Sequence, residues 1–460
     1  MNEYDCQIKE ENQDEVNEKL LQKTLKLIPY TQPLDFLSKP ENTMFTNLFH
    51  TFKFNRKHVS LKKLKESVIK ALLNHKGLLC TFSKDNNEDK FFNNGIYLNY
   101  NPEVSPNIEE IKIKDDIDKK ELELMFQNNL VIFKHYNSPQ INIKLFYNSF
   151  HIYLFCDICH TVFDGASIGI FFNSINNIYL DKKIPNDYFI YYLHKYNIDI
   201  KESKKYKEDL LYFEKYFIHD KDIYPKYSTN RSNNQNSKII FKTLTWDDLL
   251  LNLSKYFSIP NSKKITNYNI FLLMNILLTN YLFSNLEQSH HELNLTFSGR
   301  NWKKEKYSVG CLSTDYPIYY DFTKNKINMK HFYELIKRQL ELKNTISRYP
   351  FFHSDKGRLP VIIQREGEFF DVTNFCGDAE AEIIYDYSKH FNNKCSEFWS
   401  PLSVVMTIGE NLAKYDIMAD GNKYDQKDID KYIDLIEKSG KFIFENMVKI
   451  NKDEEIDIII

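Results

Sequence analysis

The chain has 460 residues, with 61 basic and 63 acidic side chains, a formal net charge of −2, and 42% hydrophobic residues. A chain of this length suggests about two or three compact units, and its hydrophobic content excludes an intrinsically disordered protein. The balanced charge argues against a nucleic-acid-binding protein, because such proteins usually carry a basic stripe.

Seven cysteines are spread from Cys6 to Cys395. Scattered cysteines in an odd number, in a chain whose acidic N-terminal segment contains no apolar signal core, indicate free thiols in the reducing cytoplasm. No apolar stretch is long enough to span a membrane. The best candidate, 270–283, is interrupted by Asn275 and Asn280 and predicts a buried helix.

The first predicted elements lead to a polar turn. Ser60 can cap a helix that has Gly77 just past its end and Leu61, Leu64, Val68 and Leu72 on one face. Residues 140–147 and 151–159 then read as neighbouring strands. The second alternates, with Ile152, Leu154, Cys156 and Ile158 on one face and Tyr153, Phe155 and Asp157 on the other.

Residues 159–165, with the sequence CHTVFDG, follow directly where that strand ends. His160 lies at the strand end, and Asp164 and Gly165 form the turn. A helix with one buried stripe is predicted behind the turn, from Ile168, Phe171, Phe172, Ile175 and Tyr179. A histidine on such a turn can act as a base near neutral pH, since the unperturbed imidazole pKa is about 6.5.

Two other groups of residues are of the types that bind metal ions, but their spacing does not fit a metal site. Cys156 and Cys159 form a CxxC pair without a second ligand pair, and Cys159 should point to the strand face opposite His160, which disfavours a Cys–His dyad between these neighbours. Residues 290–292 (HHE) lack the HExxH spacing and predict a solvated loop. We therefore predict no metal site.

The later elements are mixed. Strands are expected at 239–244, 293–297, 317–322, 402–408 and 412–417, with the last two paired across 409–411. Helices are expected at 205–217, 329–347 and 428–448, the last interrupted near Gly440, and a mobile loop is expected at 227–237. A connection near 181–185 divides the chain into predicted domains 1–183 and 184–460.

Several segments together resemble the condensation domains of nonribosomal peptide synthetases, in the superfamily of chloramphenicol acetyltransferase and the plant acyl-CoA-dependent acyltransferases. Residues 159–165 resemble the HHxxxDG motif, and Ser167 matches a serine often seen two residues beyond it. Residues 72–82 resemble the upstream RHexLRTxF segment, and 296–301 and 309–314 resemble the later GR strand end and the IGxFxNT segment. The chain departs from the family pattern at Cys159, Leu79 and Cys80, which replace a histidine, an arginine and a threonine.

The resemblance implies an α/β fold with mixed α+β sheets, in which two chloramphenicol-acetyltransferase-like lobes form a V with a central tunnel. It implies that His160 is the base or the group that positions the attacking amine. Asp164 would brace the loop through an ion pair with Arg300. Gly165 would let the thioester approach and could donate an N–H to the oxyanion, and Cys159 would be a replaceable supporting residue.

We therefore expect a free-standing condensation-type acyltransferase, cytoplasmic and monomeric. It would form an amide or an ester from an acyl group on the phosphopantetheine of a carrier protein acting in trans, with an amine or alcohol acceptor. It would bind no cofactor of its own, no nucleic acid and no membrane.

Other readings stay open. One is an acyl-CoA-dependent O- or N-acyltransferase, although the DFGWG segment of that branch is absent. Another is an epimerase relative, although the tryptophan expected after Gly165 is missing. A third, of a different class, is an inactive condensation-like docking protein, which Cys159 and Leu79 keep open. A heterocyclising relative would carry paired aspartates in the motif, and His160 argues against it.

Overall fold

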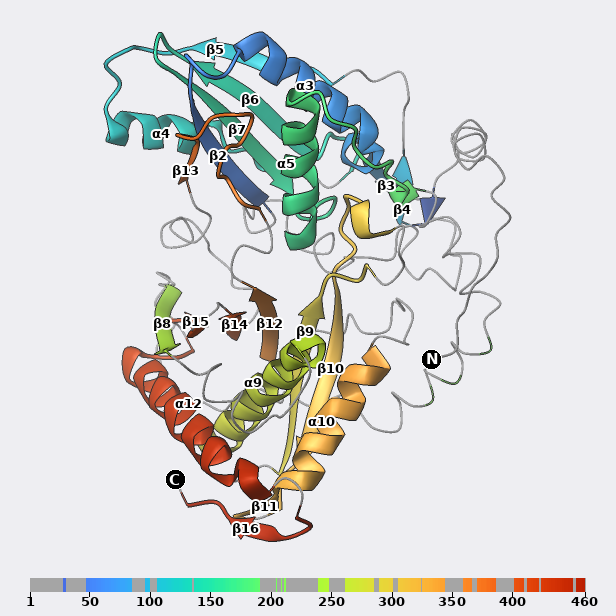
Figure 1. Ribbon diagram of the computed structural model, residues 1–460, viewed down its shortest axis with the longest axis vertical. Coiled ribbons are helices and arrows are strands. Elements are labelled where there is room, and N and C mark those ends of the chain that lie inside the picture. The colour runs from blue at the N-terminus through green and yellow to red at the C-terminus, as the bar shows by residue number, and fades with distance from the viewer. Residues whose placement is uncertain are drawn as a thin grey trace. The chain divides into compact units, whose positions relative to one another are not determined.

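The computed structural model (Figure 1) describes residues 28–29, 47–84, 96–99, 106–134, 136–190, 204, 208, 211, 239–247, 261–284, 289–300, 305–323, 325–343, 359–365, 370–385, 401–408, 412–421, 423–449 and 452–459. They belong to two compact units. The first comprises Met1–Ser203, Arg300–Leu312 and Phe369–Tyr387, and the second comprises the remaining segments. The domain boundary predicted at 183 stays a prediction; by packing, two later segments belong with the first unit.

The first unit is built on a five-stranded sheet in the order β13-β2-β7-β6-β5. Its strands are β13 (Glu382–Tyr385), β2 (Asn47–Asn55), β7 (His151–Cys159), β6 (Ile141–Tyr147) and β5 (Glu109–Lys112). Only the β5–β6 pair is parallel. The predicted pairing of the two strands before the polar turn is confirmed, since β6 and β7 run antiparallel from Ile141↔Ile158 to Tyr147↔Ile152.

Strand β7 is central and buried on both faces, which explains its nearly continuous hydrophobic sequence. Its two sets of alternating side chains enter separate cores. One set, Ile152, Leu154, Cys156 and Ile158, packs in the large core with α3 (Leu61–Asn74) and α5 (Gly165–Tyr179). The other, Tyr153 and Phe155, packs with Phe126 of α4 (Lys119–Asn129). Helices α3 and α5 lie side by side in Figure 1.

Helix α3 begins where the sequence predicts, because the Ser60 hydroxyl oxygen accepts a hydrogen bond from the Lys63 N–H. A 3₁₀ helix, η2 (Lys76–Leu79), follows and leads into β3 (Thr81–Lys84), which pairs with β4 (Ile96–Asn99); β4 also pairs with β1 (Ile28–Pro29). A Cβ atom on Gly77 would lie 2.5 Å from the Phe189 ring. Close packing therefore accounts for glycine at this position.

The second unit is built on a six-stranded sheet in the order β10-β9-β12-β14-β15-β8. Its strands are β10 (Thr314–Asp321), β9 (His290–Phe297), β12 (Leu359–Arg365), β14 (Leu402–Ile408), β15 (Leu412–Asp420) and β8 (Ile239–Asp247). The β9–β12 and β12–β14 pairs are parallel, and the predicted β14–β15 pair is antiparallel. The two mixed sheets confirm the mixed α/β class.

In the part of this unit that the structure describes, α9 (Asn261–Phe283) packs between α10 (Met329–Lys343) and α12 (Gln426–Asn446) (Figure 1). A short 3₁₀ helix, η6 (Met447–Lys449), follows α12, and β11 (Lys326–Asn328) pairs with β16 (Glu455–Asp457). As predicted, the apolar end of α9 is buried. Its Asn275 and Asn280 side chains accept hydrogen bonds from Ser439 and Tyr432 of α12, at 2.6 and 2.7 Å. Within the described residues, no helix has the length and apolarity needed to cross a membrane.

Two predictions about this unit are wrong. Helix α12 is continuous through Gly440, where a Cβ atom would lie 2.2 Å from the Trp246 ring, so that glycine makes room for a side chain of β8. His290, His291 and Glu292 lie on β9 and not in a loop. His290 bridges Asp321 and Glu292 at 2.6 and 2.7 Å, and these carboxylates outweigh burial and raise its pKa to about 9.

Two further predictions fall on residues that the structure does not describe. The loop over 227–237 lies wholly outside them. The helix over 205–217 also lies outside, apart from Glu208 and Leu211, which are helical.

Candidate active site

The polar turn has the predicted strand–turn–helix structure. Strand β7 ends at Cys159, His160 begins the turn, and α5 starts at Gly165. The turn is closed by a hydrogen bond from the Val162 N–H to the Cys159 carbonyl, at 3.1 Å. His160 is partly exposed, whereas the four residues after it are buried. The histidine is therefore the accessible group of a rigid turn.

Asp164 is the N-cap of α5 and the centre of a buried ion pair. Its Oδ2 accepts from Arg300 Nη1 and its Oδ1 from Arg300 Nη2, both at 2.9 Å. Oδ1 also accepts from the Ser167 N–H and Oδ2 from the Leu312 N–H, each at 2.8 Å. The predicted pair is present, and its geometry is bidentate. Because both oxygens already accept several hydrogen bonds, Asp164 is suited to bracing the turn and not to proton transfer.

The electrostatics agree with this role. Burial by itself would raise the pKa of Asp164, but the charge and hydrogen bonds of Arg300, with the hydrogen bonds from Ser167 and Leu312, outweigh burial and lower the pKa of this carboxyl below its usual range. The Arg300 side chain is only 5% exposed. The Asp164 carboxylate is thus charged at neutral pH, and the pair is shielded from solvent.

The segment 309–312 is fixed against this pair. The Gly310 N–H donates to Ser167 Oγ at 3.0 Å, and the Val309 N–H donates to Asp187 Oδ2 at 2.9 Å. A Cβ atom on Gly310 would lie 2.3 Å from the Phe189 ring. This ring also blocks a Cβ atom at Gly77, so one aromatic side chain packs against both glycines.

Within this segment, Cys311 lies against the histidine. Its Sγ is 3.9 Å from Nδ1 of His160, and the residue is 2% exposed. Sequence reasoning included Cys311 in a matched segment but gave it no role. No local signal could have revealed the contact, because 151 positions separate the two residues.

Cys159 is buried, and its hydrogen bonds help to hold the turn in place. Its Sγ accepts a hydrogen bond from Thr161 Oγ1 at 3.0 Å, and its N–H donates to the Gln140 carbonyl at 2.9 Å. Leu79, at the position of the family's arginine, packs against the large core.

His75 lies in the upstream segment 72–82 and has a structural role that sequence reasoning missed. It is buried, with Nδ1 2.6 Å from Asp187 Oδ2 and Nε2 2.9 Å from Ser174 Oγ. The same Asp187 oxygen accepts from the Val309 N–H. His75 therefore links the end of α3 to α5 and to the segment beside His160.

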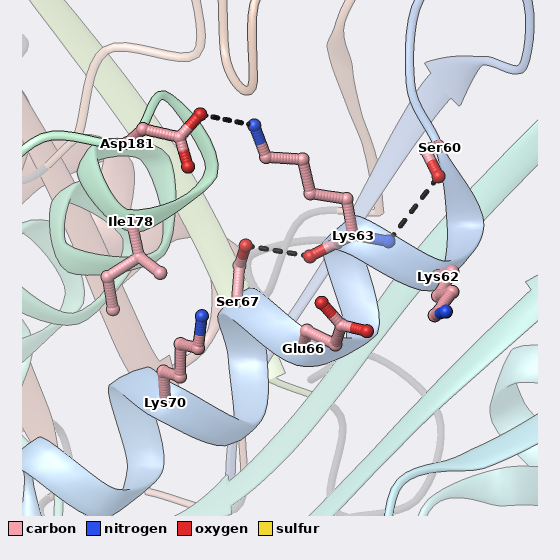
Figure 2. Close-up of a pocket in the computed structure, with 8 residues that line it drawn as sticks. All are labelled: Ser60, Lys62, Lys63, Glu66, Ser67, Lys70, Ile178 and Asp181. Carbon is pink, nitrogen blue, oxygen red and sulfur yellow. Dashed lines mark hydrogen bonds and ion pairs between the residues drawn. The ribbon is translucent and has the colours of Figure 1, made fainter.

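Two other features lie apart from this motif. A pocket of about 310 Å³ is formed by α3 and the end of α5. Figure 2 shows its lining residues, which include the ion pair of Lys63 and Asp181. Among the described residues, His58, Asp378 and Glu380 have side chains close enough together to hold a metal ion. Neither group includes a residue of 159–165 or 309–312.

Two units built on mixed sheets, one of them carrying a histidine on a strand-to-helix turn, agree with the fold that the sequence resemblance implies. The family model described as Condensation domain matches residues 37–353, more than half of the chain. The chain therefore belongs to the condensation-domain family, which comprises acyltransferases. Among curated proteins, no sequence match is significant.

Solved structures are similar over nearly the whole chain. The epimerization domain of the third module of tyrocidine synthetase B gives a TM-score of 0.65 at 14% identity, covering 93% of this chain and 98% of that one. The first condensation domain of the calcium-dependent antibiotic synthetase, with a substrate analogue, gives 0.60 at 12%, covering 93% and 96%. A starter condensation domain of rhizomide synthetase in complex with C8-CoA gives 0.65 at 11%, covering 96% and 100%. At these identities the likeness shows the fold alone.

Proposed function

We propose that this chain is a condensation-type acyltransferase that forms an amide or an ester from an acyl thioester, delivered in trans on the phosphopantetheine of a carrier protein. The family supports the reaction class. The observation that carries the proposal is the partly exposed His160 on a turn locked by the buried Asp164–Arg300 pair. Such a turn holds the imidazole at a fixed position that is partly accessible to solvent.

In the proposed reaction, the acceptor amine attacks the carbonyl carbon of the thioester, and the pantetheine thiolate leaves. His160 takes the proton that the amine loses, or orients the amine so that its lone pair meets the carbonyl. No enzyme nucleophile is needed, because the thioester is already activated. General-base assistance typically contributes about 10²–10⁴-fold, and positioning contributes much of the remainder.

The other motif residues support this step. Gly165 is the first residue of α5, and we propose that its N–H donates to the developing oxyanion. Asp164, Arg300 and Cys159 hold the turn. We further propose two chloramphenicol-acetyltransferase-like lobes around a central tunnel, in a cytoplasmic monomer that binds no cofactor of its own.

The second candidate is an acyl-CoA-dependent O- or N-acyltransferase. It is favoured by one comparison, since a similar starter condensation domain was solved with C8-CoA. An inactive docking protein is the candidate of a different class. The bidentate Asp164–Arg300 pair beside an accessible His160 disfavours it, because docking does not require that arrangement.

Donor selectivity separates these candidates. One octanoyl group is presented on phosphopantetheinylated carrier proteins and, in parallel, on CoA, each with a panel of amine and alcohol acceptors, and products are measured by mass spectrometry. The proposal predicts a higher kcat/KM for the carrier-bound donor, because contacts with the carrier supply binding and positioning energy. The His160→Ala variant serves as the control for uncatalysed aminolysis.

Two outcomes contradict the proposal. Equal or better use of octanoyl-CoA would assign the chain to the CoA-dependent branch. Absence of transfer from either donor, with carrier binding intact, would favour the docking protein.

A further inference from the structure

We infer that Cys311 is a positioning residue for His160: its sulfur holds the imidazole through Nδ1, so that Nε2 is the nitrogen that meets the acceptor. The inference rests on the proposed function, in which His160 receives or orients a proton of the acceptor. It assigns a role to a residue that local sequence pattern leaves without one.

The contact is a sulfur–nitrogen hydrogen bond. Cys311 Sγ lies 3.9 Å from His160 Nδ1, and the thiol is buried while the histidine is partly exposed. A cysteine sulfur is both a weak donor and a weak acceptor, so it can accept the Nδ1–H of the imidazole. Cys311 thus contacts the histidine from the buried side.

The position of this sulfur is fixed by its neighbours in the chain. On one side, the Gly310 N–H donates to Ser167 Oγ; on the other, the Leu312 N–H donates to Asp164 Oδ2. Asp164 also caps α5, the helix that follows the His160 turn. Asp164 therefore fixes both the segment that carries the sulfur and the turn that carries the imidazole. This shared anchor keeps the distance between the two groups constant.

The packing around this segment leaves it little freedom. Leu312 and Val309 are buried in the large core, and the Phe189 ring lies where a side chain of Gly310 would be. Cys311, within this segment, contacts His160. Substitution of the Cys311 side chain should therefore change the hydrogen bonding of the His160 imidazole without moving the backbone.

The contact affects proton transfer by His160. A hydrogen bond at one imidazole nitrogen determines which tautomer the ring adopts, and therefore which nitrogen carries the proton and which the lone pair. In the tautomer whose Nδ1–H is directed at Sγ, the ring lone pair is on Nε2, and this is the nitrogen that accepts a proton from the acceptor. When Nε2 becomes protonated, the same Nδ1–H···S bond still forms, so the contact is retained in the imidazolium. A bond of this kind is worth roughly 0.5–1.5 kcal/mol, which corresponds to about 2–12-fold in rate.

The test combines a tautomer measurement with kinetics in the full chain. Nitrogen-15 NMR of histidine-labelled protein reports the tautomer, and the His160 signals are assigned by their loss in His160→Ala. Wild type should show the neutral form protonated on Nδ1. Cys311→Ala should shift it towards the Nε2–H form and lower kcat about 2–12-fold with KM within about twofold. Cys311→Ser, which keeps an acceptor, should recover part of both effects. Cys156→Ala, at a buried cysteine on the core face of β7, should change neither.

The outcomes separate this inference from the function on which it rests. Unchanged His160 signals in Cys311→Ala would overturn the positioning role, whatever the activity. Should that variant not fold, as judged by circular dichroism, Cys311→Val, which fills the space of the thiol but offers no acceptor, takes its place, and unchanged His160 signals in Cys311→Val would overturn the positioning role. An acyl group trapped on Cys311 by mass spectrometry would also overturn it, by making the thiol a nucleophile. If wild type transfers no acyl group but its tautomer responds as expected, the proposed function fails while the positioning stands.

Discussion

Replacement of Asp164 by asparagine removes one charge of the buried pair while keeping the shape of the side chain. Arg300 is only 5% exposed and would be left without its counter-ion. The substitution would also disrupt the hydrogen bonds that Asp164 accepts. Each carboxylate oxygen accepts from at least two donors, so the amide NH₂ must face a donor in either orientation. Both effects act in the same direction, towards destabilisation.

The size of the effect follows from burial. Breaking a buried ion pair by removing one partner costs about 3–5 kcal/mol, because the remaining charge is uncompensated. For units of about 150–250 residues, each kcal/mol changes Tm by about 2–4 °C. Asp164→Asn should therefore lower Tm by roughly 6–20 °C at neutral pH. Arg300→Ala should also lower it, and the double variant should lose less than the sum of the two.

Thermal unfolding followed by circular dichroism measures this, with Glu110→Gln as the control. Glu110 forms an exposed ion pair with Lys65, at 2.7 Å, and such pairs are worth about 0–1 kcal/mol.

The pH dependence of the stability gives a second check. Because folding lowers the pKa of Asp164, its stabilisation is present above the unfolded pKa of about 3.9 and is lost as the pH falls through the folded value. The gap between variant and wild type should shrink below about pH 4. A Tm for Asp164→Asn within about 2 °C of wild type would refute the reasoning.

Three further changes test other parts of the structure. Cys159→Ser should keep most acyl-transfer activity, because oxygen can also accept the Thr161 hydrogen bond; a variant as inactive as His160→Ala would show otherwise. Burial raises the pKa of Asp157 to about 7, so its native form binds more protons than the unfolded chain between about pH 4 and 7, and the free energy of unfolding falls as the pH rises. Asp157→Asn should flatten this dependence in urea unfolding, and an unchanged slope would contradict the buried carboxyl. Gly440→Ala should lower Tm despite a helix-propensity gain of about 0.5–1 kcal/mol, because its Cβ would lie 2.2 Å from Trp246. Trp246→Leu should relieve the clash in the double variant, and a more stable single variant would exclude the clash.

The elements predicted well are those with a strong local pattern. The alternation along β7 and the 3.6-residue spacing along α5 both depend on neighbours in sequence, and the Ser60 cap is a local hydrogen bond. Gly440 was misread because its packing partner, Trp246, lies on a distant strand. His290 was misread for the same reason, since Asp321, which pairs with it, comes from the neighbouring strand β10.

The site divides in the same way. The strand–turn–helix placement of His160 follows from local periodicity, while the partnership of Asp164 with Arg300 came from a resemblance that placed both in matched motifs. The contact of Cys311 with His160 and the link from His75 to Asp187 depend on tertiary packing alone. No spacing rule within one sequence brings such pairs together, so the structure was needed to find them.

The central claim is that His160 promotes acyl transfer, and single-turnover transfer by His160→Ala tests it most directly. With an octanoyl carrier protein and a saturating amine acceptor, the variant should be at least about 10²-fold slower than wild type, with an unchanged melting temperature. A correctly folded His160→Ala variant that transfers the acyl group at a rate within about threefold of wild type would contradict the claim.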